Sequence, residues 1–185
     1  MAIKTFTTGE VLTAADTNTY LANSGLVFVK SQTVGSGVGS VTVSSAFNST
    51  YDNYHVIYTG GTQSVATGVR LNLGSANTQY YHWMVYGSYS GGAGAPQGSG
   101  QNNVAQFSWV GGGDSNSCIS DFDLFAPNTA TYTWFRMNGF YAPSGNAGFN
   151  SGVLKDTTQH TAFTLTCEAG TMTGGTITVY GYRKG

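Results

Sequence analysis

The sequence predicts an all-β protein: an antiparallel, jelly-roll-like β-sandwich preceded by a short N-terminal helical arm. From residue 26 onward, apolar and polar side chains alternate with a period of two, as in strands with one buried face. Glycine-rich turns separate these runs, and many short strands divided by such turns are typical of a sandwich or barrel. Charged residues make up 8% of the chain and hydrophobic residues 40%, so the chain can build a core beneath an uncharged polar surface.

The length and the change of pattern at residue 26 divide the chain into two parts. With 185 residues, the chain has the length of about one domain and can bury one substantial core. We therefore expect an N-terminal arm over residues 1–25 and a single β-sandwich domain over residues 26–185.

The arm carries the signals of one short helix over residues 14–23. Thr13 is placed to cap the first turn, and Asp16 occupies the position of a capping-box acid. Gly25 fits a C-terminal stop, and Gly9 is expected to set the turn before the helix. The apolar face is thin and consists mainly of Leu12, Ala15, Tyr20 and Leu21. A helix this short is marginal alone, so we expect Leu12, Tyr20 and Leu21 to make buried anchor contacts.

About ten strands follow from the alternation. They are expected at 27–34, 39–45, 54–60, 67–74, 80–88, 103–111, 118–125, 131–141, 161–169 and 175–183. Three polar, glycine-rich stretches are interpreted as loops, at 88–102, 111–117 and 142–152. The first is the longest, and a loop of that length within a domain is usually functional or disordered.

The titratable and sulfur-containing residues do not form a recognisable metal, cofactor or nucleophile motif. Cys118 and Cys167 lie in apolar strand-like runs, so we expect two small core residues rather than a disulfide. None of His55, His82 and His160 forms a short metal-ligand pair, and His82 is expected as a half-buried strand residue. No metal site and no cofactor is predicted.

Two acids on one strand are the strongest candidates for catalysis. Asp121 and Asp123 share a face, and such carboxylates serve glycoside hydrolysis or bind calcium. The simpler interpretation is a solvent-facing row opposite Cys118, Phe122 and Leu124. No G-x-S-x-G nucleophile elbow occurs either, so we expect a protein that is not an enzyme and assign no catalytic residue.

The aromatic and small polar residues suit a recognition surface. Tyr, Ser, Gly and Asn give rigid aromatic contact and adaptable hydrogen bonding, although the same residues also suit a plain β scaffold. Tyr89, Trp83 and Trp109 are candidates for surface recognition. Trp83, Trp109 and Trp134 are also the candidates for a saccharide site, but large aromatics dominate cores, so we expect each Trp in the core.

Charge and hydropathy limit the classes of partner. Seven Lys and Arg residues spread along a chain of net charge −1 predict no nucleic-acid binding, which needs several cations acting together. No apolar run approaches the roughly 20 residues that span a bilayer, and no signal-peptide pattern opens the chain. We expect synthesis in the cytoplasm, no membrane insertion and little repulsion between copies.

The first segment resembles the opening of tail-fibre and minor tail proteins of tailed bacteriophages. The resemblance lies in Phe6-Thr-Thr-Gly9-Glu10-Val11-Leu12-Thr13-Ala14-Ala15-Asp16-Thr17-Asn18-Thr19-Tyr20-Leu21. Weaker similarities lie in Val41-Thr-Val43 with Phe47 and Tyr51-Asp-Asn-Tyr54, and in Gly175-Thr-Ile-Thr-Val-Tyr180-Gly-Tyr182-Arg183. The chain is much shorter than most long tail fibres.

The resemblance implies a virion protein, often trimeric, with an N-terminal anchor and a β-sandwich head. We expect a tail fibre or other external appendage that binds other virion proteins through residues 1–25 and contacts the host surface, including its glycans. The alternative is a capsid decoration or cement protein, and a third hypothesis is a carbohydrate-binding module or enzyme on the particle. The position on the particle is left open by the sequence.

Overall fold

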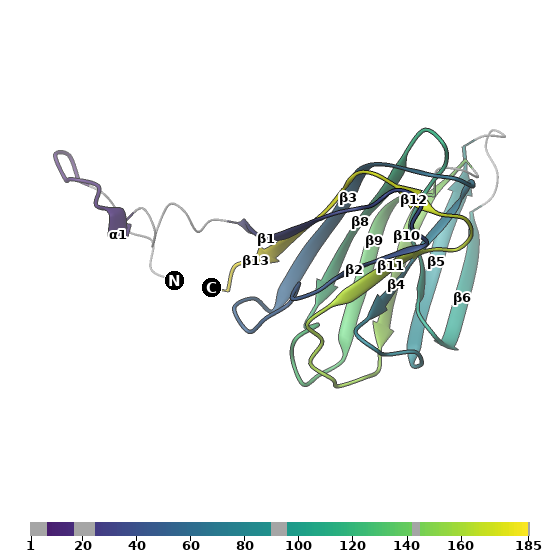
Figure 1. Cartoon of the computed structure of the whole chain (residues 1–185). Coiled ribbons are helices and arrows are strands. Elements are labelled where there is room, and N and C mark those ends of the chain that lie inside the picture. The colour runs from purple at the N-terminus through teal and green to yellow at the C-terminus, as the bar shows by residue number, and fades with distance from the viewer. Residues whose placement is uncertain (1–6, 17–24, 90–95, 142–144, 185) are drawn as a thin grey trace.

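The computed structural model describes residues 7–16, 25–89, 96–141 and 145–184, in which an antiparallel β-sandwich follows a short arm (Figure 1). The elements are α1 (Ala14–Asp16), β1 (Leu26–Thr33), β2 (Ser40–Val43), β3 (Asn53–Gln63), β4 (Thr67–Leu73), β5 (Tyr80–Ser88), β6 (Gln97–Val104), β7 (Phe107–Gly113), β8 (Cys118–Phe125), β9 (Thr133–Tyr141), β10 (Asn146–Leu154), β11 (Phe163–Cys167), β12 (Met172–Thr173) and β13 (Thr176–Tyr182). The predicted all-β class and sandwich architecture are confirmed.

The strands form two layers. The smaller sheet has the order β2-β11-β4-β7, and the larger has the order β1-β13-β3-β8-β9-β10-β5-β6. From β2 to β5, each successive strand lies in the other layer. The chain crosses from the larger to the smaller sheet again between β6 and β7 and between β10 and β11. Such crossing between two sheets is typical of a jelly roll. The hairpin of β7 and β8 joins the two layers, because Gly111–Gly113 of β7 pairs with Cys118–Ser120 of β8.

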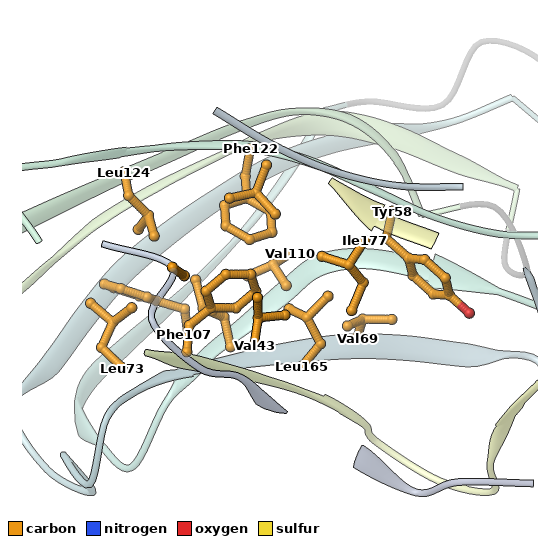
Figure 2. Packing of buried hydrophobic residues seen from close by; sticks show 14 of the residues in the cluster. Val43, Tyr58, Val69, Leu73, Phe107, Val110, Phe122, Leu124, Leu165 and Ile177 are labelled. Carbon is orange, nitrogen blue, oxygen red and sulfur yellow. The ribbon is translucent and has the colours of Figure 1, made fainter. Parts of the chain in front are cut away.

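The core lies between the inner faces of the two sheets (Figure 2). Val43, Leu73 and Leu165 of the smaller sheet point towards Phe122 and Leu124 of the larger sheet. Within the core, the rings of Phe107 and Phe135 stack with centroids 4.8 Å apart. Buried tyrosines keep their hydroxyls bonded: Tyr58 donates to the Gly174 carbonyl, and Tyr80 accepts from the Leu73 amide. The polar atoms of these large side chains are therefore satisfied inside the core.

Nine of the predicted strands each match one strand, the predicted strand 103–111 covers the end of β6 and most of β7, and two of the predicted loops contain strands instead. Residues 88–102 include most of β6, and residues 142–152 include most of β10, which lies in the middle of the larger sheet. The stretch 111–117 is only partly a loop, since Gly111–Gly113 ends β7. The assignments of 88–102 and 142–152 were wrong over β6 and β10, and that of 111–117 over its first three residues, because polar and glycine residues were taken as turn signals.

Glycines in β10 and β6 allow the neighbouring strand β5 to approach closely, with its backbone against β10 and the Trp83 side chain against β6. A Cβ on Gly148 would lie 2.0 Å from the Val85 carbonyl oxygen, and a Cβ on Gly152 would lie 2.4 Å from that of Tyr81. Gly98 and Gly100 of β6 lie against the indole of Trp83 in the same way. Here glycine therefore marks close approach within a sheet.

The described part of the arm begins as expected. The Asp16 amide donates to Thr13 Oγ1 over 3.1 Å, and the Thr13 amide donates back to Asp16 Oδ2 over 3.2 Å, which completes a capping box. Gly9 and Gly25 both have positive φ, of 85° and 80°, as residues that set turns. Residues 17–24, which hold the rest of the predicted helix, lie outside the described residues. No helix within the described ranges is long and apolar enough to cross a bilayer.

Both cysteines are buried and free, as predicted. Burial raises the pKa of the Cys118 thiol to about 12, and it also raises the pKa of the Cys167 thiol. Both therefore behave as small apolar core residues at neutral pH.

Candidate functional site

The candidate site lies on the outer face of the larger sheet, opposite the core. Four neighbouring strands contribute one row of side chains across it, Asp123 of β8, Arg136 of β9, Ser151 of β10 and Trp83 of β5. Successive residues of a strand point to opposite faces, so the row stays outside while Phe122, Phe135 and Met84 point inward. This part of the face combines charged, hydroxyl and aromatic groups.

Asp123 is the most tightly held polar residue of the face. Its carboxylate accepts hydrogen bonds from the Tyr182 hydroxyl over 2.7 Å and from Arg136 Nε over 2.8 Å. His55 Nδ1 lies 2.9 Å from Asp123 Oδ1, and because a carboxylate only accepts, this nitrogen carries the proton. Burial raises the pKa of Asp123, but the hydrogen bonds from Tyr182, Arg136 and His55 outweigh it and lower the pKa below its ordinary value. Asp123 is therefore a fixed anion.

Asp121 is the accessible acid of the pair. Its side chain is 51% exposed, and its Oδ1 lies 3.4 Å from His55 Nε2. His55 therefore lies between the two carboxylates, bonded to Asp123 through Nδ1 and facing Asp121 with Nε2. Arg136 also remains largely exposed, and its guanidinium lies 5.2 Å from the centre of the Phe125 ring. The network thus presents one free acceptor and one free donor group to solvent.

Two strands diverge beside this network and leave a groove. Along one edge of β8, residues Phe122–Phe125 pair with β9 and residues Cys118–Ser120 pair with β7 instead. β9 and β8 are therefore not paired beside Asp121. The open groove has a volume of about 640 Å³. Its outward-pointing side chains are Asp121, Asp123, Arg136, Asn138, Phe149 and Ser151. We call this set the outer-face groove.

Three exposed aromatic side chains surround Ser151. Trp83 and Trp134 are each 57% exposed and Phe149 is 64% exposed. Trp83 lies opposite Ser151 on the next strand, whereas Phe149 is two residues before Ser151 on β10 itself. A Cβ on Gly100 would lie 2.4 Å from Trp83 Cε3, and one on Gly98 would lie 2.9 Å from Trp83 Cζ2. The indole therefore rests on β6 because both of these residues are glycines.

The structure separates the three residues predicted for surface recognition. Trp83 lies beside the outer-face groove, and Tyr89, also 57% exposed, follows the end of β5. Trp109 is half-buried in the smaller sheet, 6.0 Å from the ring of His82, which points to the inner side of β5. The expectation of a core position was wrong for Trp83 and Trp134, because the outer face of this sheet carries large aromatics as well.

Asp121 and Asp123 were predicted to share a solvent-facing row, and they do lie on the same outer face, but the contacts of Asp123 were not predicted. Both point away from the core, opposite Cys118, Phe122 and Leu124, but Asp123 is largely covered and cross-linked to three other strands. The roles of Phe149 and Ser151 were missed because 142–152 was assigned as a loop. The sequence Phe149-Asn-Ser-Gly-Val-Leu154 places apolar and polar residues on both faces, so the residues of β10 themselves carry no clear strand signal.

The three predicted anchor residues fall in the arm. Leu12 is 49% exposed within the single chain, and the neighbouring Val11 is 78% exposed. Tyr20 and Leu21 lie outside the described residues. Burial of Leu12 therefore needs contacts beyond those that it makes with the described residues.

The arrangement can bind by stacking and hydrogen bonding. Within the described residues, no group of three or more His, Cys, Asp and Glu side chains is placed to hold a metal ion. The donors, acceptors and ring faces lie on paired strands, which hold them in fixed positions. Comparisons with protein-family models, curated proteins and solved structures find no match to this chain.

Proposed function

We propose that this chain is a non-enzymatic structural protein of a tailed-bacteriophage particle, such as a tail fibre or another external appendage. In this proposal residues 1–25 attach the protein to another virion protein, and the sandwich points outward and contacts the host surface. The observation that carries it is the outer face of the larger sheet, where exposed aromatics and polar groups stand on rigid strands. The resemblance of the arm to phage structural proteins supports the attachment.

The exposed apolar residues of the arm support its role as an anchor. Val11 and Leu12 follow a tight turn in which the Glu10 amide donates to the Thr7 carbonyl, and both precede the capping box of α1. The cap fixes the direction in which the chain enters the helix. Leu12 then contributes to a stripe that a neighbouring virion protein covers.

A homotrimer is part of the same proposal. The chain carries 15 acidic and basic residues in 185, and its net charge is −1, so copies repel one another little. Three arms side by side also supply the helix contacts that a single short helix lacks.

A binding role without catalysis fits the acids of the outer face. A general acid needs a raised pKa, as in a carboxyl group placed in an apolar pocket. The pKa of Asp123 is lowered instead, because Tyr182, Arg136 and His55 outweigh its burial. Asp123 therefore acts in this proposal as the structural centre of the face.

Deletion of residues 1–25 tests the proposal. The remaining sandwich is expected to fold with little change in melting temperature, because its core lies within residues 34–179, and to lose attachment to phage particles. Co-sedimentation with particles assembled without the protein measures attachment, and calorimetry measures folding. The point variant Leu12→Asp is expected to weaken attachment in the full chain, whereas Thr8→Asp, also on an exposed residue, leaves it unchanged. Undiminished attachment of the truncated chain would contradict the anchor.

A further inference from the structure

We propose that two copies of this chain pair edge to edge through β6, so that their larger sheets become one continuous sheet. The two β6 strands run antiparallel about a two-fold axis at Ser99. The contact involves only the sandwich and needs neither residues 1–25 nor the outer-face groove, so it goes beyond the proposed function. Because a two-fold contact does not fit within one three-fold assembly, it joins sandwiches of different trimers.

The free edge of β6 is the first observation that carries this pairing. β6 is the last strand of the larger sheet (Figure 1), and within the described residues only β5 pairs with it. Its other edge therefore presents a row of backbone N–H and C=O groups, which is a template for a further strand. Residues 97–101 pair with β5 in regular register, and the strand contains no charged residue and no proline. The occupant that satisfies such an edge is another β-strand.

Two other strands that end a sheet carry protection against such pairing. β1 has a bulge after Phe28 and a charged Lys30, whose Nζ donates to the Ser44 carbonyl over 2.6 Å. β2 has only four residues. Bulges, charges and short length each hinder the addition of a strand. β6 has eight uncharged residues, and its bulge lies beyond Gln101, so it is the least protected of these three strands.

The outer side of β6 is complementary to itself. Gly98 and Gly100 face outward, and the Trp83 indole lies over both. With the axis at Ser99, Gly98 of one copy lies opposite Gly100 of the second copy, so the two indoles come side by side above four glycines. Paired strands are about 4.8 Å apart, a spacing at which two aromatic rings touch. The contact therefore covers part of an indole that is 57% exposed in the single chain.

The inner side of the strand also matches a second copy. Ser99 pairs with Met84, which is buried, so Gln97, Ser99 and Gln101 form the row on the inner face. Across the axis, Ser99 meets Ser99 and Gln97 meets Gln101, and these uncharged groups both donate and accept hydrogen bonds. No like charges lie opposite one another, and the net charge of −1 adds little repulsion between the copies.

Disulfide trapping in the full-length protein tests the inference. Ser99→Cys places two thiols opposite each other at the axis. Oxidised glutathione takes up their two electrons and two protons, so that one disulfide forms between the chains and two glutathione thiols are released. Ser31→Cys is the matched control, a serine on β1 at the opposite end of the sheet. Electrophoresis without reductant is expected to show at least tenfold more covalent dimer for Ser99→Cys, and the buried Cys118 and Cys167 do not compete.

Sedimentation velocity over a range of concentrations provides the second readout. Ser99→Lys is expected to weaken the association between sandwiches at least tenfold, because two ammonium groups then face each other at the axis, and Trp83→Ala is expected to do the same. Ser31→Lys should leave the association unchanged, and thermal unfolding shows that each variant is folded. The conservative Ser99→Cys keeps the test decisive if the lysine variant does not fold.

The inference is wrong if Ser99→Cys cross-links no better than Ser31→Cys, or if a folded Ser99→Lys associates like the unchanged protein. It is also wrong if Ser99→Lys loses attachment to particles without a change in self-association, since β6 would then pair with a strand of another virion protein. Both readouts are made without particles, so a failure of the anchor leaves them unaffected.

Discussion

At the scale of single residues, the outer face is organised by one carboxylate. Asp123 is bonded by β3, β9 and β13 residues at once, and it therefore holds together strands that are far apart in sequence. The same carboxylate holds Arg136, whose guanidinium lies 5.2 Å from the centre of the Phe125 ring, and His55, whose Nε2 faces Asp121. A residue that looks like a catalytic acid in the sequence thus positions the others.

Asp123→Asn is expected to lower the free energy of unfolding by about 1–3 kcal/mol, because hydrogen bonds to a charged, largely buried group are lost or reversed. Asp121→Asn, on a half-exposed side chain, is expected to change it by less than about 0.5 kcal/mol. Urea denaturation of both variants measures the difference. Equal effects would show that Asp123 does not hold the strands together.

Two buried histidines predict a loss of stability in mild acid. Burial lowers the pKa of His82, whose Nε2 accepts from the Ser108 amide, and burial also lowers the pKa of His160 despite Asp156 3.8 Å away. The unfolded chain therefore takes up protons near pH 6.5 while the folded chain does not, so stability is full above this pH and falls below it.

We expect the free energy of unfolding to decrease between pH 7.5 and pH 5, by about 1.4 kcal/mol for each unit by which a histidine pKa is lowered. The double variant His82→Gln with His160→Gln should flatten this slope. Asp123 does not interfere, because its lowered pKa makes its own contribution disappear only at more acid pH. A slope that the double variant leaves unchanged would contradict this explanation.

At the scale of elements, the position of β10 in the sheet determines which side chains lie next to one another in the candidate site. It joins β9 to β5 in the middle of the larger sheet and brings Phe149 and Ser151 between Arg136 and Trp83. Its glycines make this possible, since the backbone and Cβ of Tyr86 and His82 occupy the space of their missing side chains.

Gly148→Ala is expected to destabilise the protein by about 1–3 kcal/mol through overpacking against β5. Gly87→Ala is the control, because Gly87 lies one pair away on β5 and its Cβ would meet nothing within 4 Å. The control should change stability by less than about 0.5 kcal/mol. Thermal unfolding checks both, and a neutral Gly148→Ala would show that the strands are not held this closely.

The strands with clear alternation were predictable, whereas the two strands assigned as loops, β6 and β10, were not. Val69, Leu71 and Leu73 of β4, or Phe163, Leu165 and Cys167 of β11, identify their strands by the buried face alone. In β6 and β10 the pairing partner supplies the side chain, as Trp83 does over Gly98 and Gly100, and this information is absent from the strand's own residues. The same reason hid half of the site, because Phe149 and Ser151 belong to β10.

At the scale of the whole molecule, the protein combines an exposed arm with a sandwich that buries its own core. The described arm residues 7–15 are all exposed, whereas the core draws on both sheets. The outer-face groove lies on the face of the larger sheet that no second layer covers, and so it remains open to a ligand (Figure 1). This division suits a protein that is attached at one end and binds at the other.

The position and copy number of the protein on an intact phage particle test the central proposal most directly. Electron cryo-microscopy is expected to show three copies forming a projection from the tail, with residues 1–25 against another virion protein and the outer-face groove exposed to solvent. Density spread over the capsid shell would contradict the appendage and indicate a decoration protein. Absence of the protein from the purified particle would contradict its assignment to the virion.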